Sequence, residues 1–337
     1  MINKTSAMVQ AGILAAVAII MALIALYVPV IGMFVNFIWP LPVIVCGYKH
    51  GLKYGIMTLI VSGIIIAMLA SPVNAFFLVV IFGLLGLILG ECMRRKMKPL
   101  TIMLYGSIGA LIALILNLVL AFLILDIDPL SMLFTSFDES LGKAAEFYRS
   151  HGFTEEQIAQ STTSMKEMIG MIRIIMPGAF VTFAPIMAFV NYWAAKKVLA
   201  RMGESFEGLP PFTQLKVPGW VIVPYALSLA GVTYFFQNNM QEHWGYKACV
   251  NIQTVCSLVL VFQAISLIYW YVESKKKPRW WADLGVAVLF FVPMFSMFAV
   301  YLGAFDTIFD YRNIRGYKYR EKQITKEDNV NKKNKKR

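Results

Sequence analysis

The sequence predicts an all-α fold, a polytopic bundle of helices that cross a membrane. Of its 337 residues, 58% are hydrophobic and only 15% are charged, and the mean hydropathy is +0.65. Soluble globular domains carry about 25% charged residues. The second observation is a series of apolar runs of about 20 residues, the length that a helix needs to cross the hydrocarbon core of a bilayer.

Nine such runs follow one another along the chain. They cover roughly residues 7–28, 31–48, 52–70, 74–93, 100–125, 174–200, 218–237, 248–272 and 281–304. The first run follows Lys4 and is too long for the apolar part of a cleaved signal peptide. We therefore interpret it as a retained helix, with cleavage near Ala25 as the alternative. Pro40 and Pro42 interrupt the second run, and glycines surround the turn after it.

Lysine and arginine residues collect in alternate loops between these runs, and the positive-inside rule assigns such loops to the cytoplasm. The basic loops contain Lys4, then Lys49 and Lys53, then Arg94, Arg95, Lys96 and Lys98, then Lys196, Lys197 and Arg201, and finally Lys275, Lys276, Lys277 and Arg279. The intervening segments are poor in positive charge, so they lie outside and the N-terminus is cytoplasmic. Nine spans would leave the basic C-terminal tail outside. Either one span is re-entrant, with 281–304 the irregular candidate, or the tail departs from the rule.

The segment 126–173 is a long hydrophilic insertion, with eight acidic residues against four Lys or Arg, a net charge of −4. Thr154 and Gln157 have the spacing of a capping box, which marks the start of a helix, and Gly152 ends the helical pattern before it. We expect two short helices folded over the outer face. The second should run toward the membrane and be kinked at Pro177.

The sequence contains no motif of a phosphate-binding loop, a metalloprotease or a serine hydrolase. His50, His151 and His243 lie in separate loops, so no metal site is expected, and the four cysteines lack the paired spacing of a zinc site or a disulfide framework. The formal charge of +12 collects at the ends of apolar runs, which argues for lipid headgroups and against nucleic acid as partners. We therefore expect no enzymatic activity, no catalytic residue and no cofactor.

Polar residues within the spans are the candidates for a binding site, because burying them in hydrocarbon is costly and such residues often line a cavity. The candidates in the predicted outer half are Asn36, Trp39, Asn74, Asn117 and Asp126. Together they could line one externally open pocket for a small solute. In the alternative interpretation, the asparagines cap helices or bond to neighbouring helices, and Trp39 lies in an aromatic belt at the membrane surface.

Small residues form a stripe along the first run. They are Ala7, Ala11, Ala15, Ala18, Ala22 and Ala25, which recur every three or four positions. Such a stripe lets another helix approach closely, and that helix belongs either to this chain or to a separate subunit. Gly83, Gly86 and Gly90 form a similar, weaker seam on the fourth run.

The segment "LGAFDTIFDYRNIRG" after the last run places Asp306 and Asp310 one helical turn apart. These carboxylates could bind a cation or pair with a basic loop. Alternatively, the segment is an amphipathic helix in the membrane interface.

These residues together resemble a family. The alanine-striped first helix, the stretch "LPVIVCGYKHGLKYG" and the end "GAFDTIFDYRNIRG" resemble the YybS-like bacterial membrane proteins, a family of unknown function, over most of the chain. The resemblance implies a multi-pass protein of the bacterial inner membrane.

The first six spans also resemble the substrate-binding S component of energy-coupling factor (ECF) vitamin transporters. That resemblance implies six helices around an externally facing pocket, and an AxxxA motif, matched by Ala11 with Ala15 and Ala18 with Ala22, that contacts a membrane coupling subunit. The long outer loop and the three extra spans depart from the S-component pattern. We divide the chain into a six-helix core at 1–200 that includes the loop 126–173, further spans at 201–304, and a charged interfacial and disordered tail at 305–337. The expected function is small-solute binding or transport; the alternative is a non-transporting membrane scaffold or regulator.

Overall fold

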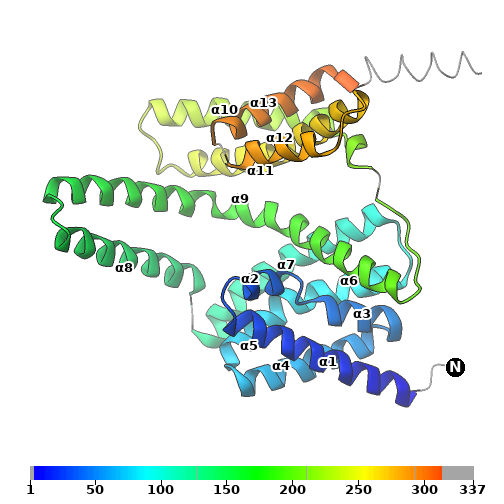
Figure 1. Cartoon of the computed structure of the whole chain (residues 1–337). Helices are drawn as coiled ribbons and strands as arrows, with labels where there is room; N and C mark the ends of the chain where they lie inside the picture. Colours follow the sequence, from blue (N-terminus) through cyan, green and yellow to red (C-terminus); the bar gives the residue numbers. More distant parts are fainter. Residues whose placement is uncertain (1–3, 127, 210, 292, 313–337) are drawn as a thin grey trace, which may run out of the picture. The chain divides into compact units, whose positions relative to one another are not determined.

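The computed structural model describes residues 4–126, 128–209, 211–291 and 293–312, and every regular element in these ranges is a helix. Eight of the described helical segments are long and apolar enough to cross a membrane, which confirms the expected polytopic all-α bundle. The chain divides into two compact units, Met1–Gly208 and Leu209–Arg337 (Figure 1). Each unit is described by itself.

The N-terminal unit contains six of the eight spans, and two of them are built from more than one helical element. Its elements are α1 (Lys4–Tyr27), α2 (Ile31–Phe37), α3 (Leu41–His50), α4 (Leu52–Leu69), α5 (Pro72–Leu78), the π-helical turn η1 (Val79–Gly83), α6 (Leu84–Arg94), α7 (Pro99–Leu125), α8 (Pro129–Ser150) and α9 (Glu155–Arg201). The second span combines α2 and α3. The fourth combines α5, η1 and α6.

The alanine stripe of α1 faces the interior of this unit. Ala7, Ala11, Ala15, Ala18 and Ala22 are at most 3% exposed, and α1 contacts α2, α3 and α4. The hydroxyl of Thr58 on α4 donates to the carbonyl of Ala11 at 3.3 Å, which shows how closely the helices approach. Large apolar side chains on the other faces of α1, such as Met8 and Ile13, are exposed. The stripe is therefore covered by helices of this chain.

The glycine seam of α6 lies against α3. A Cβ added at Gly90 would come within 2.9 Å of the carbonyl oxygen of Ile44, and one added at Gly86 would come within 3.2 Å of the Val43 side chain. The backbone of α3 and the backbone of α6 therefore meet where glycine leaves room, as in other small-residue contacts between membrane helices.

The insertion after α7 differs from the expected pair of short helices. The capping box is confirmed, because the Thr154 hydroxyl accepts from the Gln157 N–H and the Gln157 side chain accepts from the Thr154 N–H. However, α9 then continues for 47 residues through Pro177 and Pro185, and α8 has 22 residues. Figure 1 shows α8 and the first half of α9 extending away from the other helices of the unit rather than folding over them. We call α8 and this half of α9 the arm.

The C-terminal unit contains α10 (Ile222–Gln237), α11 (Trp244–Ser274), α12 (Trp280–Phe291) and α13 (Pro293–Phe309), preceded by the short 3-10 helices η2 (Phe212–Gln214) and η3 (Gly219–Val221). The expectation of a single span at 281–304 is wrong, because the chain forms two helices there. Pro293 is the first residue of α13, a position where its missing N–H costs no helical bond.

The contacts of α12 and α13 with α11 give their directions. The Tyr269 hydroxyl donates to Asp283 at 2.5 Å near the start of α12, just after the turn that follows α11, so α12 runs back along α11. Along α13, Gly303 abuts Leu260, Asp306 bonds Gln263, and the ring of Tyr311 contacts that of Trp270. In these three contacts the residue numbers increase in the same direction along both segments, so α13 is parallel to α11. The hairpin returns the chain to the end of the unit where α11 finishes.

This return predicts the side of the membrane on which the chain continues after α13. A topology reporter fused after Lys276 and the same reporter fused after Arg312 should give the same result, because both sites lie at the same end of the C-terminal unit. Alkaline phosphatase activity and green fluorescent protein fluorescence, which report opposite sides, would be measured for each fusion. Opposite signals at the two sites would contradict the hairpin.

The glycine contact between α3 and α6 predicts a stability effect. Gly90→Ala should lower the free energy of unfolding by about 1–3 kcal/mol, because the added methyl group meets the Ile44 carbonyl and the helices must separate. Gly12→Ala is the matched control, since a Cβ at Gly12 on α1 meets no atom within 4 Å. That control should be neutral or stabilising by up to ~1 kcal/mol. Thermal unfolding of both variants in detergent tests this, and equal effects would refute it.

Candidate functional site

The second span is broken near its middle. α2 ends at Phe37 and α3 begins at Leu41. In a continuous helix the Leu41 N–H would donate to the Phe37 carbonyl, but here it donates to the carbonyl of Ile38 at 3.0 Å. Pro40 supplies no N–H, which favours the interruption that the sequence predicted. The break leaves the Phe37 carbonyl without a helical partner inside an apolar span.

Asn191 on α9 bonds this carbonyl. Its Nδ2 donates to the Phe37 oxygen at 2.9 Å and to the Met187 oxygen at 3.0 Å, and the residue is fully buried. Its Oδ1 is buried and has no hydrogen-bond partner among the described residues. Sequence reasoning missed Asn191 because it searched the predicted outer half, although an isolated asparagine in "IMAFVNYWAA" meets the same criterion as the other candidates.

Trp39 lies within the break and is fully buried, so it is not part of an aromatic belt. Its Nε1 donates to the Ala18 carbonyl on α1 at 2.9 Å, and its ring is 6.5 Å from that of Phe82, centroid to centroid. Phe82 belongs to η1, and π-helical turns occur frequently at functional sites. The irregular parts of the second and fourth spans therefore face each other.

Asn36 is the residue before Phe37, and its Oδ1 is also buried and without a partner among the described residues. Two buried amide oxygens therefore lack partners among the described residues: that of Asn191, whose Nδ2 bonds the Phe37 carbonyl, and that of Asn36, the preceding residue in the chain. An unsatisfied polar atom at membrane depth costs several kcal/mol, because no water is present to bond it. Both oxygens are acceptors, so a molecule that donates hydrogen bonds would satisfy them.

The other three candidates lie apart from the break. Asn117 is buried on α7 with its Nδ2 unpartnered, whereas Asn74 on α5 and Asp126 after α7 are exposed. Among the described residues, the Trp39 side chain bonds the Ala18 carbonyl and the Asn36 Oδ1 has no partner, so neither is bonded through these atoms to any of the three. Of the five predicted residues, Trp39 lies in the break and Asn36 lies just before it in the chain, and the structure adds Asn191, which bonds the break.

A polar cavity of about 390 Å³ lies at the far end of α3, where the sequence carries the "GYKHG" turn. Its lining residues are Gln10, Tyr48, Lys49, His50, Arg94 and Glu204. The Tyr48 hydroxyl donates to Glu204 at 2.6 Å, and a His50 ring nitrogen lies 2.9 Å from the Gln10 amide oxygen. None of the five predicted site residues reaches this cavity.

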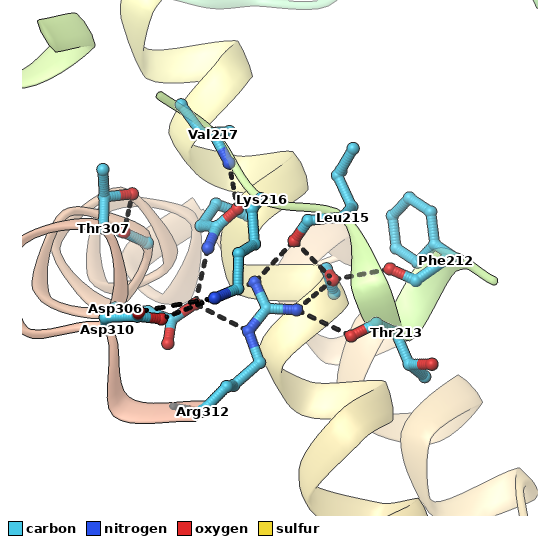
Figure 2. Close-up of polar contacts among 12 residues, drawn as sticks. Phe212, Thr213, Leu215, Lys216, Val217, Asp306, Thr307, Asp310 and Arg312 are labelled. Atoms are coloured by element: carbon cyan, nitrogen blue, oxygen red, sulfur yellow. Dashed lines mark hydrogen bonds and ion pairs between the residues drawn. The ribbon is translucent and has the colours of Figure 1, made fainter. Parts of the chain in front are cut away.

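The C-terminal unit contains a buried ionic network around Arg312 (Figure 2). The Arg312 and Asp306 side chains are 5% and 1% exposed and lie 2.9 Å apart. The guanidinium also donates to the carbonyls of Thr213 at 2.7 Å and Leu215 at 2.6 Å and to the Ser266 hydroxyl at 2.8 Å. Each of its three nitrogens therefore has an acceptor, which is what makes burial of a guanidinium tolerable.

This network holds the segment that precedes α10 against α11. Gln263 donates to Asp306 at 2.6 Å and accepts the N–H of Val217 at 2.9 Å. Lys216 pairs with Asp310 at 3.0 Å on the surface. The two carboxylates of the sequence motif thus pair with two separate basic groups. Among the described residues, no group of three or more His, Cys, Asp or Glu side chains is placed to hold a metal ion.

The bond from Asn191 predicts a loss of stability when it is removed. Asn191→Ala should lower the free energy of unfolding by about 1–3 kcal/mol, because it leaves the Phe37 carbonyl unpaired within an apolar span. Asn74→Ala is the control, since Asn74 is exposed and its removal should change stability by less than about 0.5 kcal/mol. Thermal unfolding in detergent measures both, and an unchanged melting temperature for Asn191→Ala would contradict the assigned role.

Comparison with known proteins gives the family. Residues 16–307 match the family described as "Predicted membrane protein (DUF2232)". The "Uncharacterized protein YybS" of Bacillus subtilis (strain 168) is 27% identical over 311 residues, which cover 92% of this chain and 99% of the relative. No solved structure matches the chain. Neither description names an activity, and the expected YybS-like resemblance is confirmed. Because the matched region spans most of the sequence, the chain belongs to the DUF2232 family of predicted membrane proteins.

Proposed function

We propose that this protein is a small-solute binding or transport component of the bacterial inner membrane, with its N-terminus in the cytoplasm, and that the solute binds at the break in the second span. The observation that carries the proposal is the buried amide oxygen of Asn191, which has no partner among the described residues although its Nδ2 bonds the Phe37 carbonyl at the break; the Asn36 oxygen, one residue before Phe37, is likewise buried and unpaired there. Polar groups at membrane depth are costly and frequently mark solute pathways. Interrupted membrane helices are a recurrent setting for such sites.

The unpaired Oδ1 atoms of Asn36 and Asn191 indicate which class of solute would fit the site. Two acceptor oxygens favour a molecule with hydrogen-bond donors, such as an ammonium, amide or hydroxyl group, over an inorganic anion. Trp39, which lies within the break and is fully buried, supplies an apolar wall. In this proposal the exposed Asn74 and Asp126 lie at the outer approach to the site.

Access to the site requires movement, because both amide oxygens are shielded from solvent. α2 is the suitable moving element. It has seven residues, it is bounded by the break on one side and by Val30, with φ of 64°, on the other, and Ile31, Met33 and Phe34 are exposed. A β-branched residue with positive φ is strained, and such strain concentrates in segments that switch. The observed arrangement then corresponds to a closed state of the site.

The alanine stripe does not support a coupling subunit at the positions that the S-component resemblance implied. Ala11, Ala15, Ala18 and Ala22 are covered by helices of this chain. A coupling subunit that uses the first helix would instead meet its exposed large side chains, such as Met8 and Ile13.

The arm favours the second candidate function, a membrane scaffold or regulator. It exposes large apolar side chains, including Phe147, Phe153, Met165 and Met168, on a segment with an excess of acidic residues. Exposed apolar groups rimmed by charge are typical of protein contact surfaces.

A thermal-shift screen on the purified full chain tests the solute proposal. Amino acids, amines, nucleosides and vitamins would be added, and a true ligand at 100 times its Kd should stabilise the folded state by about 2.7 kcal/mol. The stabilisation should disappear in Asn36→Leu and persist in Asn238→Leu, whose exposed asparagine ends α10 in the other unit. A shift that survives Asn36→Leu, or a screen without any stabilising solute, would overturn the proposal.

A further inference from the structure

The C-terminal unit contains an apolar groove between α11 and α13 with a volume of about 490 Å³. α11 contributes Leu267, Ile268 and Tyr271, and α13 contributes Leu302, Phe305 and Phe309. The rings of Phe305 and Phe309 stack at 5.6 Å, yet these residues remain 63% and 57% exposed. The groove is therefore open along one side and lined by hydrocarbon and aromatic surface.

The acidic residue that lines the groove is paired with a basic one. Asp306 borders the groove; its Oδ2 pairs with Arg312 and accepts from Gln263 (Figure 2), whereas its Oδ1 is buried and has no hydrogen-bond partner among the described residues. The ionic network thus closes the inner wall without presenting a net charge. An occupant of the groove itself should accordingly be apolar.

Aromatic residues mark the level of the membrane surface at one end of the groove. Tyr269, Trp270 and Tyr271 lie near the end of α11, and Trp280 and Trp281 begin α12 on the other side of the turn. Tyrosine and tryptophan are enriched where the hydrocarbon meets the headgroups. The groove begins at Tyr271 and runs from this level along α13 toward Leu302, in the direction of the hydrocarbon core.

Positive charge collects just beyond this aromatic level. The turn between α11 and α12 carries Lys275, Lys276, Lys277 and Arg279 within five residues. The Lys275 Nζ lies 5.9 Å from the centroid of the Tyr271 ring, which lines the groove. The only acidic residue in the first turn of α12, Asp283, is bonded to the Tyr269 hydroxyl. Basic residues in this position attract anionic lipid headgroups.

We propose that the groove binds one anionic phospholipid, with an acyl chain along Leu267, Leu302 and Phe305 and the phosphate at Lys275. The apolar lining, the aromatic level and the basic turn occur in the order in which a phospholipid presents its chain, its interfacial region and its charge. The site is independent of the break in the second span, which lies in the other unit.

Native mass spectrometry of the purified full chain tests the proposal. The protein would be incubated with equimolar phosphatidylglycerol and phosphatidylcholine of identical chains. One bound phosphatidylglycerol should be retained in preference to phosphatidylcholine. Leu302→Trp should abolish that retention by filling the groove. Leu227→Trp, at a position on α10 that is 68% exposed and outside the groove, should leave it intact.

A substitution at the proposed phosphate-binding residue keeps the test decisive even if Leu302→Trp fails to fold. Lys275→Gln alters only a surface charge and should lower the preference for phosphatidylglycerol about fivefold, the effect of one basic residue near an anionic headgroup. Lys247→Gln, at the opposite end of α11, is its control. Equal retention of both lipids by the unmodified protein, or an unchanged preference in Lys275→Gln and folded Leu302→Trp, would overturn the proposal.

Discussion

Every backbone polar group at membrane depth must find a partner within the protein, and both units are organised around places where helical bonding does not provide one. In the N-terminal unit the gap is the Phe37 carbonyl, which Asn191 bonds from α9. In the C-terminal unit the carbonyls without helical partners belong to the irregular segment before α10. This segment lies along α11, and its carbonyls accept hydrogen bonds from Arg312. In each case a side chain far away in sequence supplies the donor. These contacts therefore determine which elements are neighbours as well as stabilising them.

These side-chain to backbone hydrogen bonds also depend on small residues, because a donor on one helix reaches the backbone of another only where the two helices approach closely. Trp39 reaches the Ala18 carbonyl across the alanine stripe of α1, and the glycines of α6 admit the backbone of α3. The same close packing removes space from around the break, which is why Asn36 keeps an unpaired oxygen that no solvent reaches. The close packing of the helices thus also explains why the amide oxygen of Asn36 has no hydrogen-bond partner.

Much of the fold follows from local signals in the sequence. Apolar length locates eight spans, the prolines of the second span locate its break, and Thr154 with Gln157 locates the start of α9. The hairpin of α12 and α13 could not be predicted, since a proline within an apolar run is compatible with either a kink or a reversal. The pairing of Asn191 with Phe37 and of Arg312 with the segment before α10 depends on tertiary neighbours. A single sequence carries no signal for those neighbours, so the site was predicted only in part.

The continuity of α9 has a mechanical consequence. A helix of 47 residues is about 70 Å long, more than twice the thickness of a hydrocarbon core, and it carries the arm at one end and Asn191 toward the other. Because the helix is continuous, a displacement of the arm moves the segment that carries Asn191, the residue that bonds the Phe37 carbonyl, unless the helix bends between them. Pro177 lies at the inner end of the arm and Pro185 lies between the arm and Asn191, and prolines are positions where such a helix can bend. One continuous helix thus joins the arm to the residue that bonds the break in the second span.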